Sequence, residues 1–107
     1  MTNTVRPEGV TQEQAHHWLE LLRREARSAA QGRLSDVQRG AETPAVAAAL
    51  FDKFGAGLCC ATHILGLDSG TLQREVDALA REIDPDFDAN RKARWEARPA
   101  AFSFECP

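Results

Sequence analysis

Apolar residues recur at intervals of three and four along three stretches of this chain, which is the spacing of one face of an α-helix. The clearest series are Ala15, Leu19, Leu22, Ala26 and Ala29, then Val46, Leu50 and Phe54, and finally Leu72, Val76, Leu79, Ala80 and Ile83. The chain has no tyrosine, and valine, isoleucine and aromatic residues are sparse, so strand formers are scarce. Since 107 residues suffice for one modest core, the sequence predicts a single all-α domain.

Capping and breaking residues predict where the helices begin and end. Thr11 and Gln14 form a capping box before a helix over about 12–31, which Gly32 breaks or loosens, and the sequence allows a short helical turn over 35–39. Thr43 and Pro44 begin a second helix, which Gly55 stops. Further helices are predicted over 58–65, 69–83 and 87–97. The prediction is a small bundle of about five helices over 11–107, with a flexible lead at 1–10 and an extended C-terminal tail.

Residues 57–83, GLCCATHILGLDSGTLQREVDALAREI, resemble the helix-turn-helix of bacterial transcription regulators. In that superfamily a small residue of the first helix faces the second, a glycine four positions later supports the turn, and an aliphatic residue seats the second helix. Thr62, Gly66 and Leu72 occupy these positions, although alanine is usual where Thr62 stands. A turn this tight suits glycine, because glycine adopts positive φ without steric cost. We therefore expect Gly66 to have positive φ and a helix-turn-helix over about 58–83.

The resemblance implies a small DNA-binding transcriptional regulator that acts as a homodimer and needs no cofactor. The second helix of the motif would enter the major groove of double-stranded DNA, with side chains that contact bases: Ser69, Thr71, Gln73 and Arg74. The basic residues that follow would hold phosphates: Arg91, Lys92, Arg94 and Arg98. The long first helix, with Trp18, Leu21 and, at its far end, Leu34, is a candidate dimer interface for this function and for the alternative below.

The charge pattern supports an alternative function. The formal net charge is −3, and residues 58–90 carry two arginines against seven carboxylates, a net of −5. A nucleic-acid-binding protein usually has a basic surface, and here only residues 91–107 have a net positive charge, of +2. The alternative is an acidic helical protein-interaction module, an adaptor or inhibitor, whose helix-turn-helix-like shape presents the acids of 68–88 to a protein and does not bind DNA.

The cysteines raise the question of a metal site. Cys59, Cys60 and His63 are close enough on a helix to share a metal, and Cys106 with His16 or His17 could complete four ligands. No CxxC spacing occurs, and three cysteines do not make a disulfide framework. Because an unpaired cysteine packs as a small hydrophobe, we expect thiols in the core and no metal.

No nucleophile–base set, phosphate loop or calcium loop is recognisable, so no enzyme is predicted. The chain has no stretch of about 18 uninterrupted apolar residues, and the segment MTNTVRPEGV is too polar for a signal peptide. The expectation is a soluble cytoplasmic protein without a membrane partner.

Overall fold

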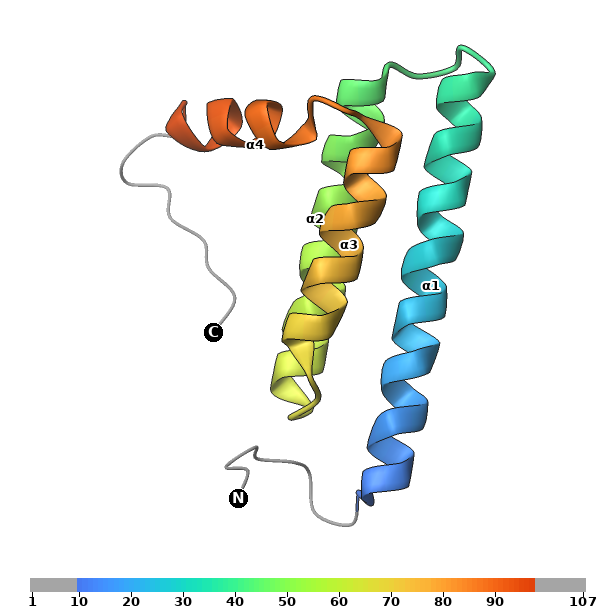
Figure 1. The fold of residues 1–107 in the computed structure, drawn as a ribbon, viewed down its shortest axis with the longest axis vertical. Coiled ribbons are helices and arrows are strands. Elements are labelled where there is room, and N and C mark those ends of the chain that lie inside the picture. Colours follow the sequence, from blue (N-terminus) through green and yellow to red (C-terminus); the bar gives the residue numbers. More distant parts are fainter. Residues whose placement is uncertain (1–9, 98–107) are drawn as a thin grey trace.

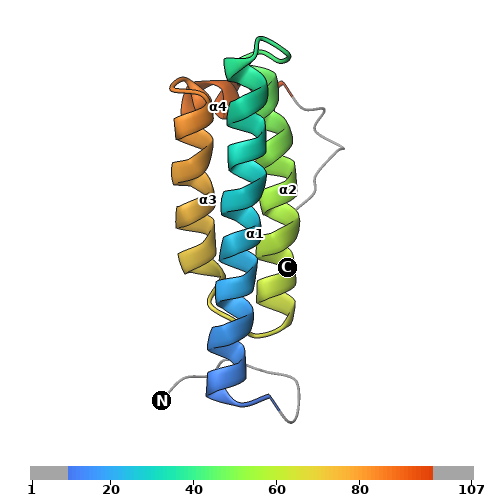
Figure 2. The same ribbon diagram turned by 90° about the vertical axis from the view of Figure 1, so that its right-hand side faces the viewer.

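The computed structural model describes residues 10–97, which form four helices (Figure 1). These are α1 (Gln12–Gln38), α2 (Pro44–Ile64), α3 (Ser69–Ile83) and α4 (Phe87–Glu96). The first three form a bundle in which α2 runs antiparallel to α1 and α3, with α2 and α3 on either side of α1 in Figure 2, and α4 crosses one end of the bundle. The prediction of an all-α fold is confirmed, since residues 10–97 contain no strand.

The number of helices is four rather than about five, because two predicted breaks do not occur. Gly32 lies inside α1, so the segments 12–31 and 35–39 are one helix of 27 residues. Gly55 and Gly57 lie inside α2, so the segments before and after them are one helix of 21 residues. A glycine in a helix interior costs only about 1 kcal/mol relative to alanine, and tertiary packing can outweigh that cost.

The predicted helix starts are confirmed by their caps. Thr11 and Gln14 make the reciprocal capping box, each backbone N–H donating to the other side chain at 3.0 Å. The Thr43 hydroxyl accepts from the backbone N–H of Val46 at 3.3 Å, and Pro44 is the first residue of α2. Asp68 caps α3 in the same way. Local hydrogen bonding therefore fixes where each of these three helices begins.

The turn between α2 and α3 is built as predicted, with Gly66 at φ 72°. The N–H of Leu67 donates to the carbonyl of Thr62 at 2.8 Å, and the N–H of Gly66 donates to that of His63 at 3.0 Å. This pattern is a Schellman motif, which ends a helix and reverses the chain. The helices then run antiparallel beside each other along their length (Figure 1), instead of crossing at the large angle of a helix-turn-helix. The helix-turn-helix geometry expected over 58–83 is not confirmed.

Gly55 allows α2 and α3 to approach closely. It is buried, and a Cβ added to it would lie 2.4 Å from Cγ1 of Val76. The prediction that Gly55 ends the helix is therefore wrong. Gly55 lies inside α2, and because it has no side chain, α3 can pack closely against α2 at this position. Around it lies the buried core, whose members from the three long helices are Ala26, Ala30, Ala47, Ala48, Phe51, Cys59, Leu72, Val76, Ala80 and Ile83.

Ion pairs hold α1 against α3. The carboxylate of Glu75 accepts from Arg23 at 2.6 Å and from Arg27 at 2.7 Å. Burial raises the pKa of Glu75, but the hydrogen bonds and attraction of the two guanidinium groups outweigh burial and hold that pKa below its usual value. A lowered pKa means that folding favours the ionised form of this carboxyl.

The predicted tail and most of the predicted lead, residues 1–9 and 98–107, lie outside the described residues. Arg98 and Cys106 belong to this part of the chain.

Replacing Gly55 and Gly57 separately with alanine tests the close contact between α2 and α3. Gly55→Ala should lower the free energy of unfolding by about 1–3 kcal/mol, because the new methyl group collides with the stiff side chain of Val76. Gly57→Ala is the matched control, since its Cβ would meet nothing within 4 Å, and it should stabilise the fold by up to about 1 kcal/mol. Urea unfolding measures both, and equal effects of the two substitutions would contradict the packing described.

The Glu75 ion pairs predict a pH-dependent stability. Because the folded pKa is lowered, the stabilisation is present above the unfolded-state pKa of about 4.3 and is lost as the pH falls through the folded value. Glu75→Gln should therefore cost about 1–2 kcal/mol of unfolding free energy at neutral pH and progressively less in acid. Glu82→Gln, at an exposed position of the same helix, is the control. A Glu75→Gln defect of constant size across the acid range would exclude the ionised pair as its cause.

Candidate interaction surface

Most of the exposed large apolar side chains of the described residues gather on one side of the bundle. Six are exposed, and five of them belong to α1 and α2: Leu21 (40 %), Val46 (49 %), Leu50 (39 %), Phe54 (44 %) and Ile64 (70 %). The sixth, Trp95, is on α4. Exposed apolar residues that gather on one side of a small protein can mark a contact site.

The apolar residues of α2 form a row along the helix. Val46, Leu50 and Phe54 are four residues apart, and Ile64 follows Val46 by eighteen residues, which is five helical turns. Gly57 and Ala61 fall between them on the same side, and the exposed Lys53, seven residues after Val46, borders the row. One long face of α2 is thus mainly apolar and accessible.

Leu21 continues this surface onto α1. It precedes Gly32 by eleven residues, or three helical turns, so both lie on the same side of α1. Gly32 borders α2, because it lines a hollow between the two helices. We call the surface formed by Leu21 and Gly32 on α1 and by Val46, Leu50, Phe54 and Ile64 on α2 the α1/α2 face.

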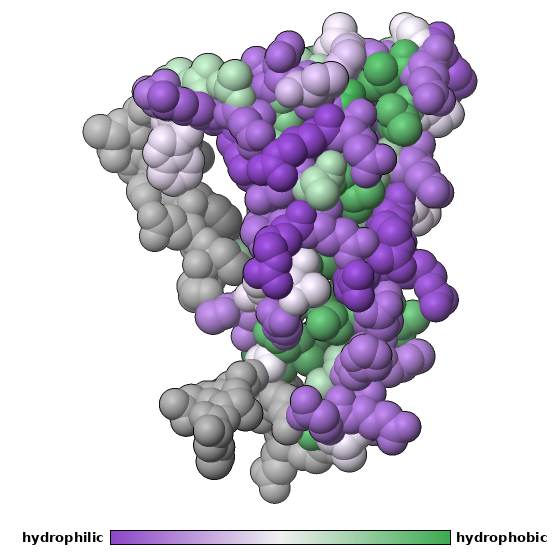
Figure 3. Space-filling view, viewed as in Figure 1, coloured by the Kyte–Doolittle hydropathy of each residue, from purple (hydrophilic) through white to green (hydrophobic). Residues whose placement is uncertain are grey.

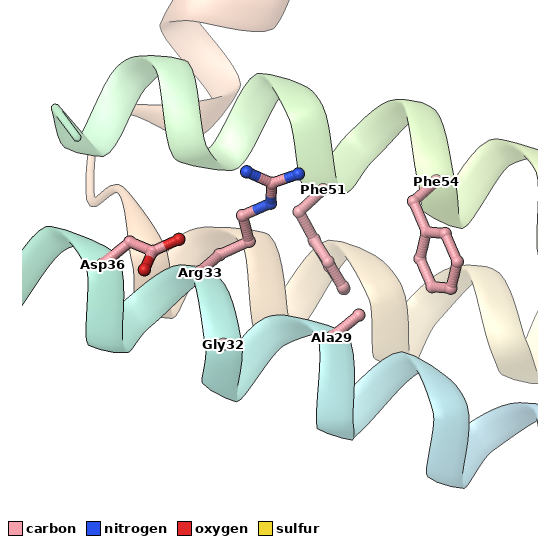
Figure 4. A pocket seen from close by; sticks show the side chains of 6 residues that line it. All are labelled: Ala29, Gly32, Arg33, Asp36, Phe51 and Phe54. Atoms are coloured by element: carbon pink, nitrogen blue, oxygen red, sulfur yellow. The ribbon is translucent and has the colours of Figure 1, made fainter. Parts of the chain in front are cut away.

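The hollow in this face has a volume of about 460 Å³ and an apolar floor (Figure 4). Phe51 and Phe54 point from α2 towards α1, where Gly32 leaves space that a side chain would fill. A Cβ added to Gly32 would meet nothing within 4 Å. Arg33 and Asp36 form a polar rim, and Arg33 also pairs with Glu42 at 3.3 Å. An opening of this size accommodates a large apolar side chain or a small ligand.

The face formed by α3 and the front of α1 is chemically different. Figure 3 shows mainly hydrophilic residues there, with apolar residues visible between the helices. Its carboxylates are largely engaged: Glu75 with two arginines, Asp77 with Arg91 at 3.1 Å and Asp88 with Arg81 at 2.9 Å. Five of the seven acids of 68–88, which the sequence predicts as a possible contact surface for a protein partner, have a hydrogen bond or an ion pair within the bundle: Asp68, Glu75, Asp77, Asp84 and Asp88.

Arg91 joins three helices at one point. Its guanidinium lies 3.1 Å from Asp77 on α3 and 3.8 Å from Asp52 on α2, and its Cζ stacks 4.6 Å from the ring centroid of Phe87. Arg94 adds a pair with Asp52 at 3.5 Å. Burial raises the pKa of Asp52, and the two arginines offset only part of that shift. The basic residues of α4 therefore attach it to the bundle.

The residues predicted to contact DNA do not share one face. Ser69, Thr71 and Arg74 lie at the start of α3, where Arg74 is exposed and donates to the Thr71 hydroxyl at 3.3 Å. Gln73 donates to Asp77 at 2.9 Å. The predicted phosphate contacts Arg91, Lys92 and Arg94 are on α4, beyond the far end of α3, whose 15 residues span about 22 Å. Arg98 is outside the described residues.

The cysteines and histidines do not assemble a metal site in the described part of the chain. Among residues 10–97 no group of three His, Cys, Asp or Glu side chains could hold a metal ion. Cys59 is a free, buried thiol, and burial raises its pKa. The prediction of a thiol in the core is confirmed there, but Cys60 is disulfide-bonded, so that prediction is wrong for the second cysteine.

The α1/α2 face was not predicted from the sequence, although the apolar series that contributes to it was identified there as evidence for a helix. The series Val46, Leu50 and Phe54 identifies α2 as a helix, yet the structure buries Ala47 and Phe51 and exposes that series. Because α2 is apolar almost all round, periodicity does not indicate which side faces the core. By length and composition α2 is also apolar enough to cross a membrane, and 33 % of that stretch is buried in the bundle.

Comparisons with protein-family models, with curated proteins and with solved structures find no match for this chain.

Proposed function

We propose that this chain is a protein-interaction module, an adaptor or inhibitor, that binds a protein through the α1/α2 face. The observation that carries the proposal is the presence of five exposed large apolar side chains on α1 and α2, one of which, Phe54, lines a hollow between the two helices. Burying a leucine or phenylalanine side chain fully contributes about 1.5–3 kcal/mol, so covering this face with a partner is strongly favourable.

The shape of the face suits a helical partner. Val46, Leu50 and Phe54 form a row with the four-residue spacing of an α-helix, and the hollow beside Gly32 lies alongside this row. Helix-in-groove recognition uses such rows of apolar anchors, with a large side chain inserted into a pocket. The polar rim at Arg33 and Asp36 supplies hydrogen-bonding groups at the edge of the contact.

The proposed function is the protein-interaction module that the charge pattern of the sequence indicated as an alternative. The proposed contact surface is different, because it is the α1/α2 face and not the acids of 68–88. Three of the seven acids between 68 and 88 that the sequence offered to a partner, Glu75, Asp77 and Asp88, are paired with arginines of the same chain. Breaking such pairs to contact a partner would leave charged groups without their hydrogen bonds, which is costly. The apolar face requires no such rearrangement.

DNA binding is the second candidate function, and one observation favours it. The exposed side chain of Arg74 stands beside Thr71 near the start of α3. The start of a helix carries unpaired N–H groups and suits a phosphate. Arg91 and Arg94, however, are held in ion pairs with carboxylates, so phosphate contacts by them would have to replace those pairs.

Site-specific cross-linking tests the interaction module. A photoreactive amino acid at position 50, in the cells that naturally make the chain, should give a discrete protein adduct after irradiation. The same group at the exposed Ala78 of α3 is the matched control and should give little. Adding Phe54→Glu should abolish the adduct at position 50, because a charge in the apolar contact is strongly unfavourable. Equal adducts from positions 50 and 78 would contradict the proposal.

Fluorescence polarisation with random duplex DNA over a salt series tests the second candidate. The interaction module should bind duplex weakly or not at all, even at low salt, where charge attraction is least screened. A DNA-binding protein would instead lose affinity steeply as salt rises. Specific binding that Arg74→Ala weakens by about tenfold or more, as expected for a base contact, would favour the DNA function over the interaction module.

A further inference from the structure

We infer that Cys60 on α2 forms a disulfide bond with Cys106, which ties the segment 98–106 along the outer side of α2. The chain has three cysteines, at positions 59, 60 and 106. Cys60 is disulfide-bonded, whereas Cys59 is a free, buried thiol. Within one chain, Cys106 is the cysteine that remains to bond Cys60. The inference concerns a covalent link and does not depend on the proposed function.

The two adjacent cysteines lie on different sides of α2. Cys59 follows Gly55 by four residues, is 6 % exposed and belongs to the core, on the side of α2 that packs against α3. Cys60 is turned about 100° from it and is only partly buried. Burial also raises the pKa of Cys59, which makes that thiol a poor nucleophile. A sulfur that approaches α2 from outside therefore meets Cys60.

The chain beyond α4 is long enough to reach Cys60. Arg94 of α4 pairs with Asp52 of α2 at 3.5 Å, which fixes where α4 meets this helix. Cys60 follows Asp52 by eight residues, or about 12 Å along α2. The nine residues from 98 to 106 span up to about 30 Å when extended. This reach exceeds the distance along α2 and leaves room for the Arg94 side chain and the last turn of α4.

The residues before Cys106 alternate in a way that suits this path. Successive side chains of an extended segment point to opposite sides, so Phe102, Phe104 and Cys106 share one side. A bond from Cys106 to α2 therefore turns both phenylalanine rings towards that helix. Ala56 is exposed one turn before Cys60, and its small side chain leaves room for a ring. The rings then cover a part of α2 that the three-helix core leaves open.

The tied segment borders the α1/α2 face and leaves the hollow open. Cys60 precedes Ile64 by one turn, so the bond lies beside this residue at one edge of the face. Phe54, which lines the hollow, precedes Cys60 by six residues and is about 120° away around the helix. The disulfide and a partner on the α1/α2 face are therefore compatible.

The bond forms by thiol–disulfide exchange with a low-molecular-weight disulfide, R–S–S–R. The thiolate of Cys106 attacks one sulfur of R–S–S–R, which releases one RS⁻ and leaves a mixed disulfide. The thiolate of Cys60 then attacks the Cys106 sulfur and releases the second RS⁻. The two cysteines are oxidised, R–S–S–R is reduced to two thiols, and the protons that the cysteines lose pass through water to the two RS⁻ groups. An excess of thiol drives the same steps in reverse.

Peptide mapping of the full chain tests the pairing. The protein is equilibrated with glutathione and glutathione disulfide, its free thiols are trapped with N-ethylmaleimide in denaturant, and it is digested with trypsin without reduction. Mass spectrometry should find the Cys60 peptide linked to the Cys106 peptide, with the trapping reagent on Cys59. Cys59→Ser is the matched control and should keep the link, whereas Cys60→Ser should lose it. Circular dichroism checks that both variants retain their helices.

Three results would overturn the pairing: trapping reagent on both Cys60 and Cys106 of the natural sequence, a link through Cys59, or a link that joins two chains. The third appears as a covalent dimer in gel electrophoresis without reductant.

The same equilibrium tests the path along α2. Packed rings raise the effective concentration of Cys106 at Cys60. Replacing both Phe102 and Phe104 with serine should therefore lower the equilibrium constant for bond formation against glutathione tenfold or more. Ser103→Ala, on the other side of the extended segment, is the control and should leave the constant unchanged. Equal constants for the natural sequence and the double serine variant would overturn the packing of this segment on α2.

Discussion

The close approach of α2 and α3 at Gly55 is the contact on which the rest of the architecture depends. A Cβ on Gly55 would lie 2.4 Å from Val76, so only glycine lets these helices lie antiparallel at this distance. This contact sets the side of α2 that is buried, with Ala47 and Phe51 towards α1 and α3. Val46, Leu50 and Phe54 are then directed outward. The exposed apolar face is a consequence of the core and is not an independent feature of α2.

Ion pairs between charged side chains connect the helices of the bundle, and several large apolar side chains of α1 and α2 are exposed on its surface. Glu75 binds two arginines of α1, and Arg91 joins α2, α3 and α4 over the ring of Phe87. Several charged groups of the acidic and basic segments are therefore engaged within the bundle, while others, among them Arg74, Glu82 and Lys92, are exposed. The exposed apolar residues of α1 and α2 are the reason why we propose a protein surface, rather than a phosphate backbone, as the partner.

Local features of the fold could be predicted from the sequence, and long-range ones could not. The caps at Thr11 and Thr43 and the positive φ of Gly66 depend on neighbouring residues, and these predictions are confirmed. Gly32 and Gly55 were expected to end helices, but whether a glycine breaks a helix depends on what packs against it. The candidate surface was missed for the same reason, since the inner side of an apolar helix is decided by its partners. Antiparallel packing likewise separates Thr71 from the basic residues of α4.

Hydroxyl-radical footprinting tests most directly the claim that the α1/α2 face is covered by protein in the cell. Side-chain oxidation would be compared between the chain in its native cells and the purified chain at high dilution, with mass spectrometry as the readout. Phe54 and Leu50 should be oxidised less in the cell than in the dilute sample. His63, exposed on the opposite side of α2 from Phe54, should be oxidised equally in both. Equal oxidation of Phe54 in the two samples would show an uncovered face and would contradict this account.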